Sequence, residues 1–202
     1  MGIWEITEPW QEMLKSFQDK PCDIDDIQSD KRKQERLAVR LALKHLAGSE
    51  MNINYTENGA PVLQNSPYSI SISHTTGYAA VILSKKPYPG IDIEYRSERA
   101  WKLRTKYLGE NELEMFASSE KLQDDDKLPE KADHATICWC AKETAFKALQ
   151  QTEVDFIKHL HIEPFTLSKS GILKLKETKT PQLQTFDINF EVTENYIITW
   201  KA

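Results

Sequence analysis

Two stretches of the chain carry apolar residues at the spacing of an amphipathic helix. In residues 29–48, Leu37 and Leu41 recur with alanines beside them, Ser29 or Asp30 can cap the start, and Gly48 suits the end. A second helix is predicted over about residues 133–150, in DHATICWCAKETAFKALQ, and a further helical pattern lies at residues 101–116. Each half of the chain therefore contains one main helix.

Strand patterns accompany both helices. Residues 68–74 alternate polar and apolar positions, residues 78–84 form an apolar run, and the HTTG turn between them predicts a hairpin. Short extended pieces are expected around the turn at residues 57–59, and another strand at 91–95 after the PYPG break. Residues 164–178 and 184–200 alternate again. The pattern predicts an α+β fold of two lobes, residues 1–98 and 99–202.

Composition excludes several classes of protein. Of the 202 residues, 40% are hydrophobic and 28% charged, which is typical of a globular chain. A net charge of −5 argues against a broad nucleic-acid surface. No run approaches the roughly 18 apolar residues of a membrane helix, and the start lacks signal-peptide features. Three cysteines give no even disulfide framework, so we expect a soluble cytoplasmic protein.

The strand IDIE places two carboxylates on one face. Asp92 and Glu94 are two residues apart and therefore point the same way. On the helix at 133–150, Trp139, Glu143 and Lys147 share one face at i, i+4 and i+8. Three carboxylates from two elements would suit Mg²⁺, which prefers oxygen ligands and keeps positions for water and phosphate. The competing interpretations are a solvated strand edge for the first pair and a surface ion pair for Glu143 and Lys147.

Other polar residues are ambiguous by themselves. His74 ends an alternating strand, where a histidine is either structural or functional. Arg32, Arg36 and Arg40 form a helical stripe that is either a solvated face or a phosphate socket. Cys138 and Cys140 are two apart in mid-helix and point in different directions, which argues against a zinc site. The usual dinucleotide, P-loop and hydrolase-elbow motifs do not occur in the sequence.

Three motifs occur in a specific order: SISH at 71–74, GIDIE at 90–94 and WCAKETAFKAL at 139–149. Together they resemble the Sfp-type 4′-phosphopantetheinyl transferases, which show Ser-His, then G-x-D-x-E, then W-x-x-K-E-x-x-x-K. The resemblance implies two pseudo-symmetric lobes, with coenzyme A and Mg²⁺ in the cleft between them and an acyl or peptidyl carrier protein as partner. It also implies a monomer.

The resemblance assigns roles by position. The implied Mg²⁺ ligands are Asp92, Glu94 and Glu143. The implied coenzyme A contacts are Arg36 or Arg40, Ser73, His74, Lys142 and Lys147. Lys147 would stabilise the departing phosphate oxygen, and Glu143 would be the base for the carrier serine, with Glu112 as the second candidate. Carriers are acidic, so a basic patch should receive them; the candidates are Arg96, Arg99, Lys102, Arg104 and Lys106.

Two positions depart from the family pattern. Ala60 stands where the family commonly has a lysine before proline, and SISH replaces the commoner F-N-x-S-H. The first change leaves open a non-catalytic homologue that binds coenzyme A or a carrier. A Mg²⁺-dependent phosphohydrolase is a further alternative.

Overall fold

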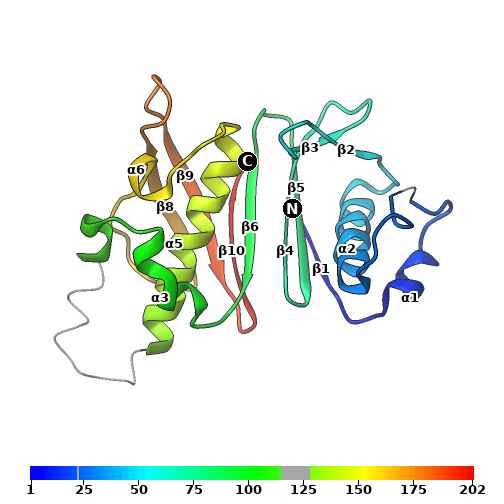
Figure 1. Ribbon diagram of the computed structural model, residues 1–202, viewed down its shortest axis with the longest axis horizontal. Coiled ribbons are helices and arrows are strands. Elements are labelled where there is room, and N and C mark those ends of the chain that lie inside the picture. Colours follow the sequence, from blue (N-terminus) through cyan, green and yellow to red (C-terminus); the bar gives the residue numbers. More distant parts are fainter. Residues whose placement is uncertain (22, 115–127) are drawn as a thin grey trace.

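The computed structural model describes residues 1–21, 23–114 and 128–202. In these residues the chain has an α+β architecture of antiparallel sheets with helices packed on them (Figure 1). The first half contains β1 (Gly2–Glu5), α1 (Trp10–Leu14), α2 (Asp30–Ala47), β2 (Ile53–Tyr55), β3 (Pro61–Leu63), β4 (Ser69–Thr75) and β5 (Tyr78–Ser84). The second half contains β6 (Gly90–Tyr95), α3 (Arg99–Leu103), η1 (Arg104–Lys106), α5 (Leu128–Leu149), α6 (Phe156–His159), β7 (Leu160–Ile162), β8 (Ser170–Glu177), β9 (Thr185–Val192) and β10 (Tyr196–Lys201).

The N-terminal lobe packs α2 on a sheet of order β1-β5-β4. The side chain of Ser29 accepts a hydrogen bond from the backbone N–H of Arg32, and Gly48 ends the helix with φ 75°. Leu37 and Leu41 are buried against the sheet. The predicted helix, the 69–84 hairpin and the short β2-β3 hairpin are all confirmed.

The C-terminal lobe packs α5 across a sheet of order β6-β10-β9-β8-β7. The alanines and cysteines of α5 are buried against Ile188, Phe190 and Ile197 of that sheet. The helix begins at Leu128, five residues before the predicted start. The helical pattern at 101–116 corresponds to α3, η1 and a helical segment at 110–114, while residues 115–116 lie outside the described residues.

Strand β6 belongs to the second sheet. Its backbone pairs with β10, with Asp92 opposite Thr199 and Glu94 opposite Ile197. The change from one sheet to the other along the chain therefore occurs between β5 and β6, before residue 98, where the sequence predicts the boundary of the two lobes. Strand β6, which carries Asp92 and Glu94, is an edge strand of the second sheet.

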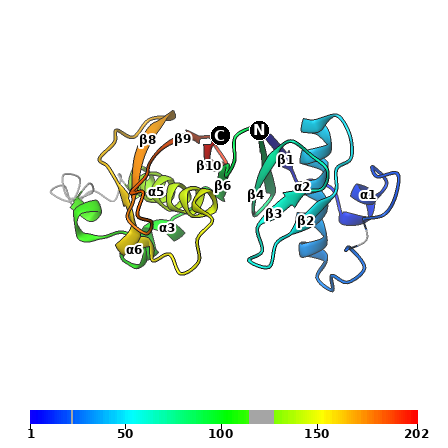
Figure 2. The same cartoon turned by 90° about the horizontal axis from the view of Figure 1, so that it is seen from above.

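Two sheet edges meet where β4 lies beside β6 (Figure 2). Side chains bridge the two strands: the Ser71 hydroxyl accepts from the Ile91 N–H at 3.2 Å, and the Thr75 hydroxyl accepts from the Tyr95 N–H at 3.0 Å. Ser73, between them, donates to Asp92. We call Ser71, Ser73 and Thr75 the hydroxyl row. It joins the lobes at the place where the candidate site residues gather.

No helix in the described part of the chain is long and apolar enough to cross a membrane.

Candidate active site

Asp92 lies at the centre of the seam between the lobes. Alternation along β6 buries Ile91 and Ile93 on one face and directs the carboxylate of Asp92 to the other, where it is only 5% exposed. Its Oδ1 atom accepts hydrogen bonds from the Ser73 hydroxyl and the Lys147 ammonium, both at 2.8 Å. Its Oδ2 atom is buried and has no hydrogen-bond partner among the described residues. Such an unsatisfied carboxylate oxygen is costly unless a ligand or cation satisfies it.

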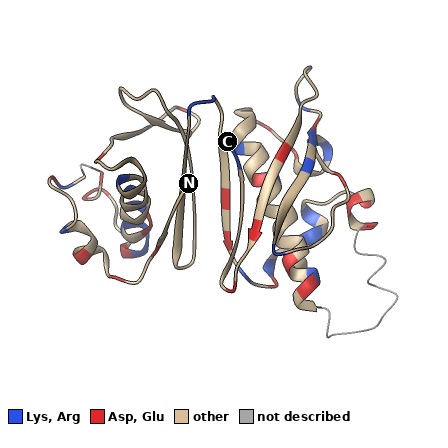
Figure 3. Cartoon of the chain, turned by 180° about the vertical axis from the view of Figure 1, so that it is seen from behind, with Lys and Arg blue, Asp and Glu red and all other residues tan. Residues whose placement is uncertain are grey.

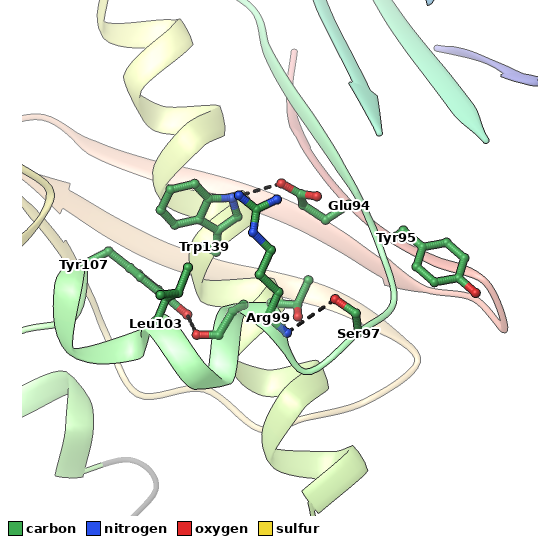
Figure 4. A pocket seen from close by; sticks show the side chains of 9 residues that line it. Glu94, Tyr95, Ser97, Arg99, Leu103, Tyr107 and Trp139 are labelled. Atoms are coloured by element: carbon green, nitrogen blue, oxygen red, sulfur yellow. Dashed lines mark hydrogen bonds between the residues drawn. The ribbon is translucent and has the colours of Figure 1, made fainter. Parts of the chain in front are cut away.

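Glu94 lies two residues further along the same face of β6. One oxygen accepts a hydrogen bond from Thr75 Oγ1 at 3.2 Å. The other accepts from the indole Nε1 of Trp139, also at 3.2 Å (Figure 4). Burial, reinforced by the charge of Asp92, raises the pKa of Glu94 above its usual value. In Figure 4 the side chain of Arg99 reaches toward this carboxylate and the indole, whereas Tyr95 points away. The pocket beside Glu94 is largely apolar and lies between α3 and α5.

Helix α5 brings the third carboxylate and a lysine to the same place. Burial, followed by repulsion from Asp92, raises the pKa of Glu143 to about 7. Glu94 contributes to the same shift, so all three carboxylates interact with one another. Lys147, one turn after Glu143, donates to Asp92 and also to the carbonyl of Ile91 at 2.9 Å. The predicted grouping of these residues from two elements is therefore present in the structure.

Gly90 lets the helix approach this closely. A Cβ at Gly90 would lie 2.2 Å from the carbonyl oxygen of Thr144, which is backbone of α5 and cannot move by itself. Thr144 also hydrogen-bonds to Thr199 of β10, with 2.6 Å between the two hydroxyl oxygens. Glycine at the start of the GIDIE motif thus fixes the distance between the two elements that carry the carboxylates.

The three carboxylates do not form a closed cage around a cation. Within the described part of the chain, no three His, Cys, Asp or Glu side chains converge as a metal site, and Lys147 supplies the positive charge beside Asp92. The donor set still fits Mg²⁺, because Asp92 keeps a free buried oxygen and the repulsion among Asp92, Glu94 and Glu143 would be relieved by a divalent cation.

A second hollow lies between α2 and the β3–β4 edge of the N-terminal lobe. Its lining includes Arg32, Arg36, Tyr55, Gly59 and His74. The Arg36 guanidinium lies 4.7 Å from the centre of the Tyr55 ring, and His74 Nδ1 lies 3.7 Å from a carboxylate oxygen of Glu35. Figure 3 shows acidic positions along β6, and Lys and Arg positions on the helices at either side of it. The hollow thus presents two arginines and a histidine, together with the carboxylate of Glu35.

The two candidate arginines occupy different surroundings. Arg36 lines the hollow with His74, whereas Arg40 lines another depression, with Phe17 and Asn52. Arg40 is bound to Asp23 at 2.8 Å and is largely buried. Of these two arginines, Arg36 is the one that lines the hollow with His74, and its Nε atom also lies 3.6 Å from a carboxylate oxygen of Asp23.

Glu112 and Lys142 form a buried ion pair. Lys142 is fully buried and donates to Glu112 at 2.7 Å and to the carbonyls of Tyr107 and Phe156 at 2.8 and 2.9 Å. Glu112 in turn accepts from the backbone N–H groups of Gly109 and Ile162. These contacts use all three protons of the lysine and both oxygens of the glutamate. In this structure each side chain is engaged by the other and by backbone groups, and the roles expected of Lys142 at coenzyme A and of Glu112 as a second base stay predictions.

The sequence did contain a signal for this burial. Lys142 lies on the same helix face as Cys138 and Ala145, both of which are fully buried. A lysine among such neighbours requires a buried acceptor. Burial also lowers the pKa of Lys142 and raises the pKa of the Cys138 thiol, which makes Cys138 a poor metal ligand.

The basic patch expected to receive a carrier protein is only partly available. Arg96 forms a bidentate ion pair with Asp133 at 2.6 and 2.5 Å. Lys102 pairs with Glu98 at 2.8 Å, and the Arg104 guanidinium stacks on Trp101 at 3.8 Å. Arg99 lines the pocket beside Glu94, and its positive charge acts on that carboxylate.

Comparison with known proteins gives one family. No curated protein matches the chain. A family model described as the 4′-phosphopantetheinyl transferase superfamily matches residues 88–200, a range that includes β6, α5, Asp92, Glu94, Glu143 and Lys147. The match covers more than half of the 202 residues and ends within the last strand of the C-terminal sheet. The protein thus belongs to the 4′-phosphopantetheinyl transferase superfamily.

Proposed function

We propose that this protein transfers the 4′-phosphopantetheine arm of coenzyme A to a serine of an apo carrier protein, in a Mg²⁺-dependent reaction of the Sfp type. The observation that carries the proposal is the meeting of Asp92, Glu94, Glu143 and Lys147 at the seam, inside the region that matches the family. A helix packed on an antiparallel sheet in each half of one chain supports the Sfp-type assignment, with pseudo-symmetric lobes.

The reaction joins the carrier serine oxygen to the β-phosphorus of coenzyme A. The bond from that phosphorus to adenosine 3′,5′-bisphosphate breaks, and the bisphosphate leaves with the bonding electrons. The serine must lose its proton, and Glu143 is the proposed acceptor, directly or through a water held by the cation, because it lies beside Asp92 and Glu94. The pKa of about 7 holds for the protein without a cation, and Mg²⁺ on this carboxylate would lower it.

Asp92 and Glu94 complete the proposed Mg²⁺ ligands, and the free Oδ2 of Asp92 supports this role. The bound ion would neutralise the pyrophosphate as charge shifts toward the leaving group. Lys147 stabilises the negative charge on the departing oxygen, and its ammonium already lies at 2.8 Å from Asp92. Arg36 and His74 hold the nucleotide end, so that binding there positions the reacting phosphate.

The test is a mass measurement. The protein is incubated with coenzyme A, Mg²⁺ and a panel of apo carrier proteins from fatty-acid, polyketide and nonribosomal-peptide synthesis. The mass of each carrier is then measured by mass spectrometry. A gain of one phosphopantetheine on any carrier, lost in Asp92→Asn but kept in Asp187→Asn, supports the proposal. Asp187 is a suitable control because it is an exposed carboxylate on β9 whose ion-pair partner among the described residues is Lys174, at 3.5 Å.

The same assay separates the alternatives. Binding of coenzyme A without any mass gain on the panel would point to the non-catalytic homologue, for which Ala60 in place of a lysine is the specific observation. Release of phosphate from simple phosphate esters would point to a phosphohydrolase. Full activity in Asp92→Asn would refute the metal assignment.

A further inference from the structure

The hydroxyl row contacts both carboxylates of β6. Ser73 Oγ donates to Asp92 Oδ1 at 2.8 Å, and Thr75 Oγ1 donates to Glu94 Oε2 at 3.2 Å. Both hydroxyls come from β4 in the N-terminal lobe, whereas both carboxylates belong to the C-terminal sheet. Ser73 is only 8% exposed and Asp92 only 5%, so water competes little for the first of these contacts.

We infer that Ser73 and Thr75 are positioning residues that hold the carboxylates of Asp92 and Glu94 ready for the cation. The inference rests on the metal assignment in the proposed function. At Asp92, the Ser73 hydroxyl and the Lys147 ammonium both engage Oδ1. Two donors on one oxygen fix the rotation of the carboxylate, and Oδ2 is left as the free oxygen. Hydrogen bonds of this kind orient metal-binding carboxylates and raise their affinity.

The two faces of strand β4 would then act on different ligands, one on Mg²⁺ through Asp92 and Glu94, and the other on coenzyme A. His74 lies between Ser73 and Thr75 in the sequence, so its side chain points to the opposite face, where it lines the hollow with Arg36. The family resemblance led us to expect Ser73 beside the phosphates of coenzyme A. Its hydroxyl is directed at Asp92 instead, which gives the two halves of the Ser-His motif different tasks.

The experiment compares Ser73→Ala with Ser71→Ala. Ser71 is the matched control, because it lies on the same strand and face and is also buried, and its hydroxyl accepts from the Ile91 N–H and contacts no carboxylate among the described residues. Mn²⁺ affinity is measured by electron paramagnetic resonance at saturating coenzyme A, and coenzyme A affinity is measured separately in EDTA. Thermal unfolding shows that each variant is folded.

The expected result is a loss of about tenfold or more in Mn²⁺ affinity for Ser73→Ala, with coenzyme A affinity in EDTA unchanged. Ser73→Thr, which keeps the hydroxyl, should restore most of the Mn²⁺ affinity. Thr75→Val should weaken Mn²⁺ binding, and Thr75→Ser should preserve it. In turnover, Ser73→Ala should need more Mg²⁺ for the half-maximal rate without a higher KM for coenzyme A.

Several results would overturn the inference. Weaker coenzyme A binding in EDTA would show that Ser73 contacts the nucleotide, and an unchanged Mn²⁺ affinity would show that its hydroxyl does not orient Asp92. An equal loss in Ser71→Ala would mean that any damage to the seam has this effect. The unmodified protein is measured before any variant is made. If it did not bind Mn²⁺, the metal assignment in the proposed function would be refuted.

Discussion

The buried pair of Lys142 and Glu112 should contribute strongly to the stability of the C-terminal lobe. Neither side chain reaches solvent to any useful extent, and each is satisfied only by groups that the fold brings to it. Removal of one partner leaves the other charge buried and uncompensated, which costs about 3–5 kcal/mol. We therefore expect Lys142→Met and Glu112→Gln each to lower the Tm by about 6–20 °C, at about 2–4 °C per kcal/mol for a domain of this size.

The assay is urea and thermal unfolding of both single variants, the double variant and Lys102→Met. The double variant should lose less stability than the two single losses added together, with a coupling of about 0.5–3 kcal/mol, because the two groups share one interaction. Lys102 forms an ion pair of nearly the same length with Glu98, but both side chains are exposed. Its loss should therefore cost no more than about 1 kcal/mol.

The same variants test whether Glu112 is catalytic. At a temperature where Glu112→Gln is still folded, its transfer rate per folded molecule should be close to that of the unmodified protein. If Glu112→Gln were folded but inactive, that result would support Glu112 as the general base. If Lys142→Met and Glu112→Gln lost no more stability than Lys102→Met, the argument that burial makes this ion pair costly to break would be refuted.

Three further outcomes are expected. Gly90→Ala should destabilise the protein by about 1–3 kcal/mol and lower the transfer rate, since its Cβ would push α5 away from β6; unfolding and rate measurements check this. Lys147→Met should reduce kcat by about 100-fold or more with little change in the KM for the carrier; a preserved kcat would exclude Lys147 from the chemical step. Burial lowers the pKa of His134 below 6.5, so below that pH the unfolded chain binds more protons than the folded one, and stability should fall as the pH drops toward 5. His134→Gln should reduce the fall of the Tm with falling pH. An unchanged dependence of the Tm on pH would show that His134 is not its cause.

The sequence predicted the elements of the site because their signals are local. Alternation places Asp92 and Glu94 on one face of a strand, and helical spacing places Trp139, Glu143 and Lys147 on one face of α5. The order of three motifs then suggested that the two elements meet. That meeting is confirmed by the hydrogen bonds from Lys147 to Asp92 and from Trp139 to Glu94.

What the sequence could not predict depends on long-range pairing. Nothing near residue 95 indicates that β6 pairs with β10 rather than with the preceding hairpin. The partner of Lys142 is 30 residues away, and the hydroxyl of Ser73 meets Asp92 only because two sheet edges lie side by side. Such contacts arise from the tertiary fold and leave no periodic pattern.

The pairing of β6 with β10 also bears on how the chain is made. About a hundred residues separate the two strands, so at a synthesis rate of about 5–20 residues per second β6 waits about 5–20 s for its backbone partner. An apolar strand with an open edge is prone to pair with another chain in that interval. Strand β4 is already complete when β6 emerges, and its hydroxyls can accept from the N–H groups of Ile91 and Tyr95 at once. The contacts that join the two lobes in the finished protein would then shelter the nascent strand until the ribosome has delivered β10.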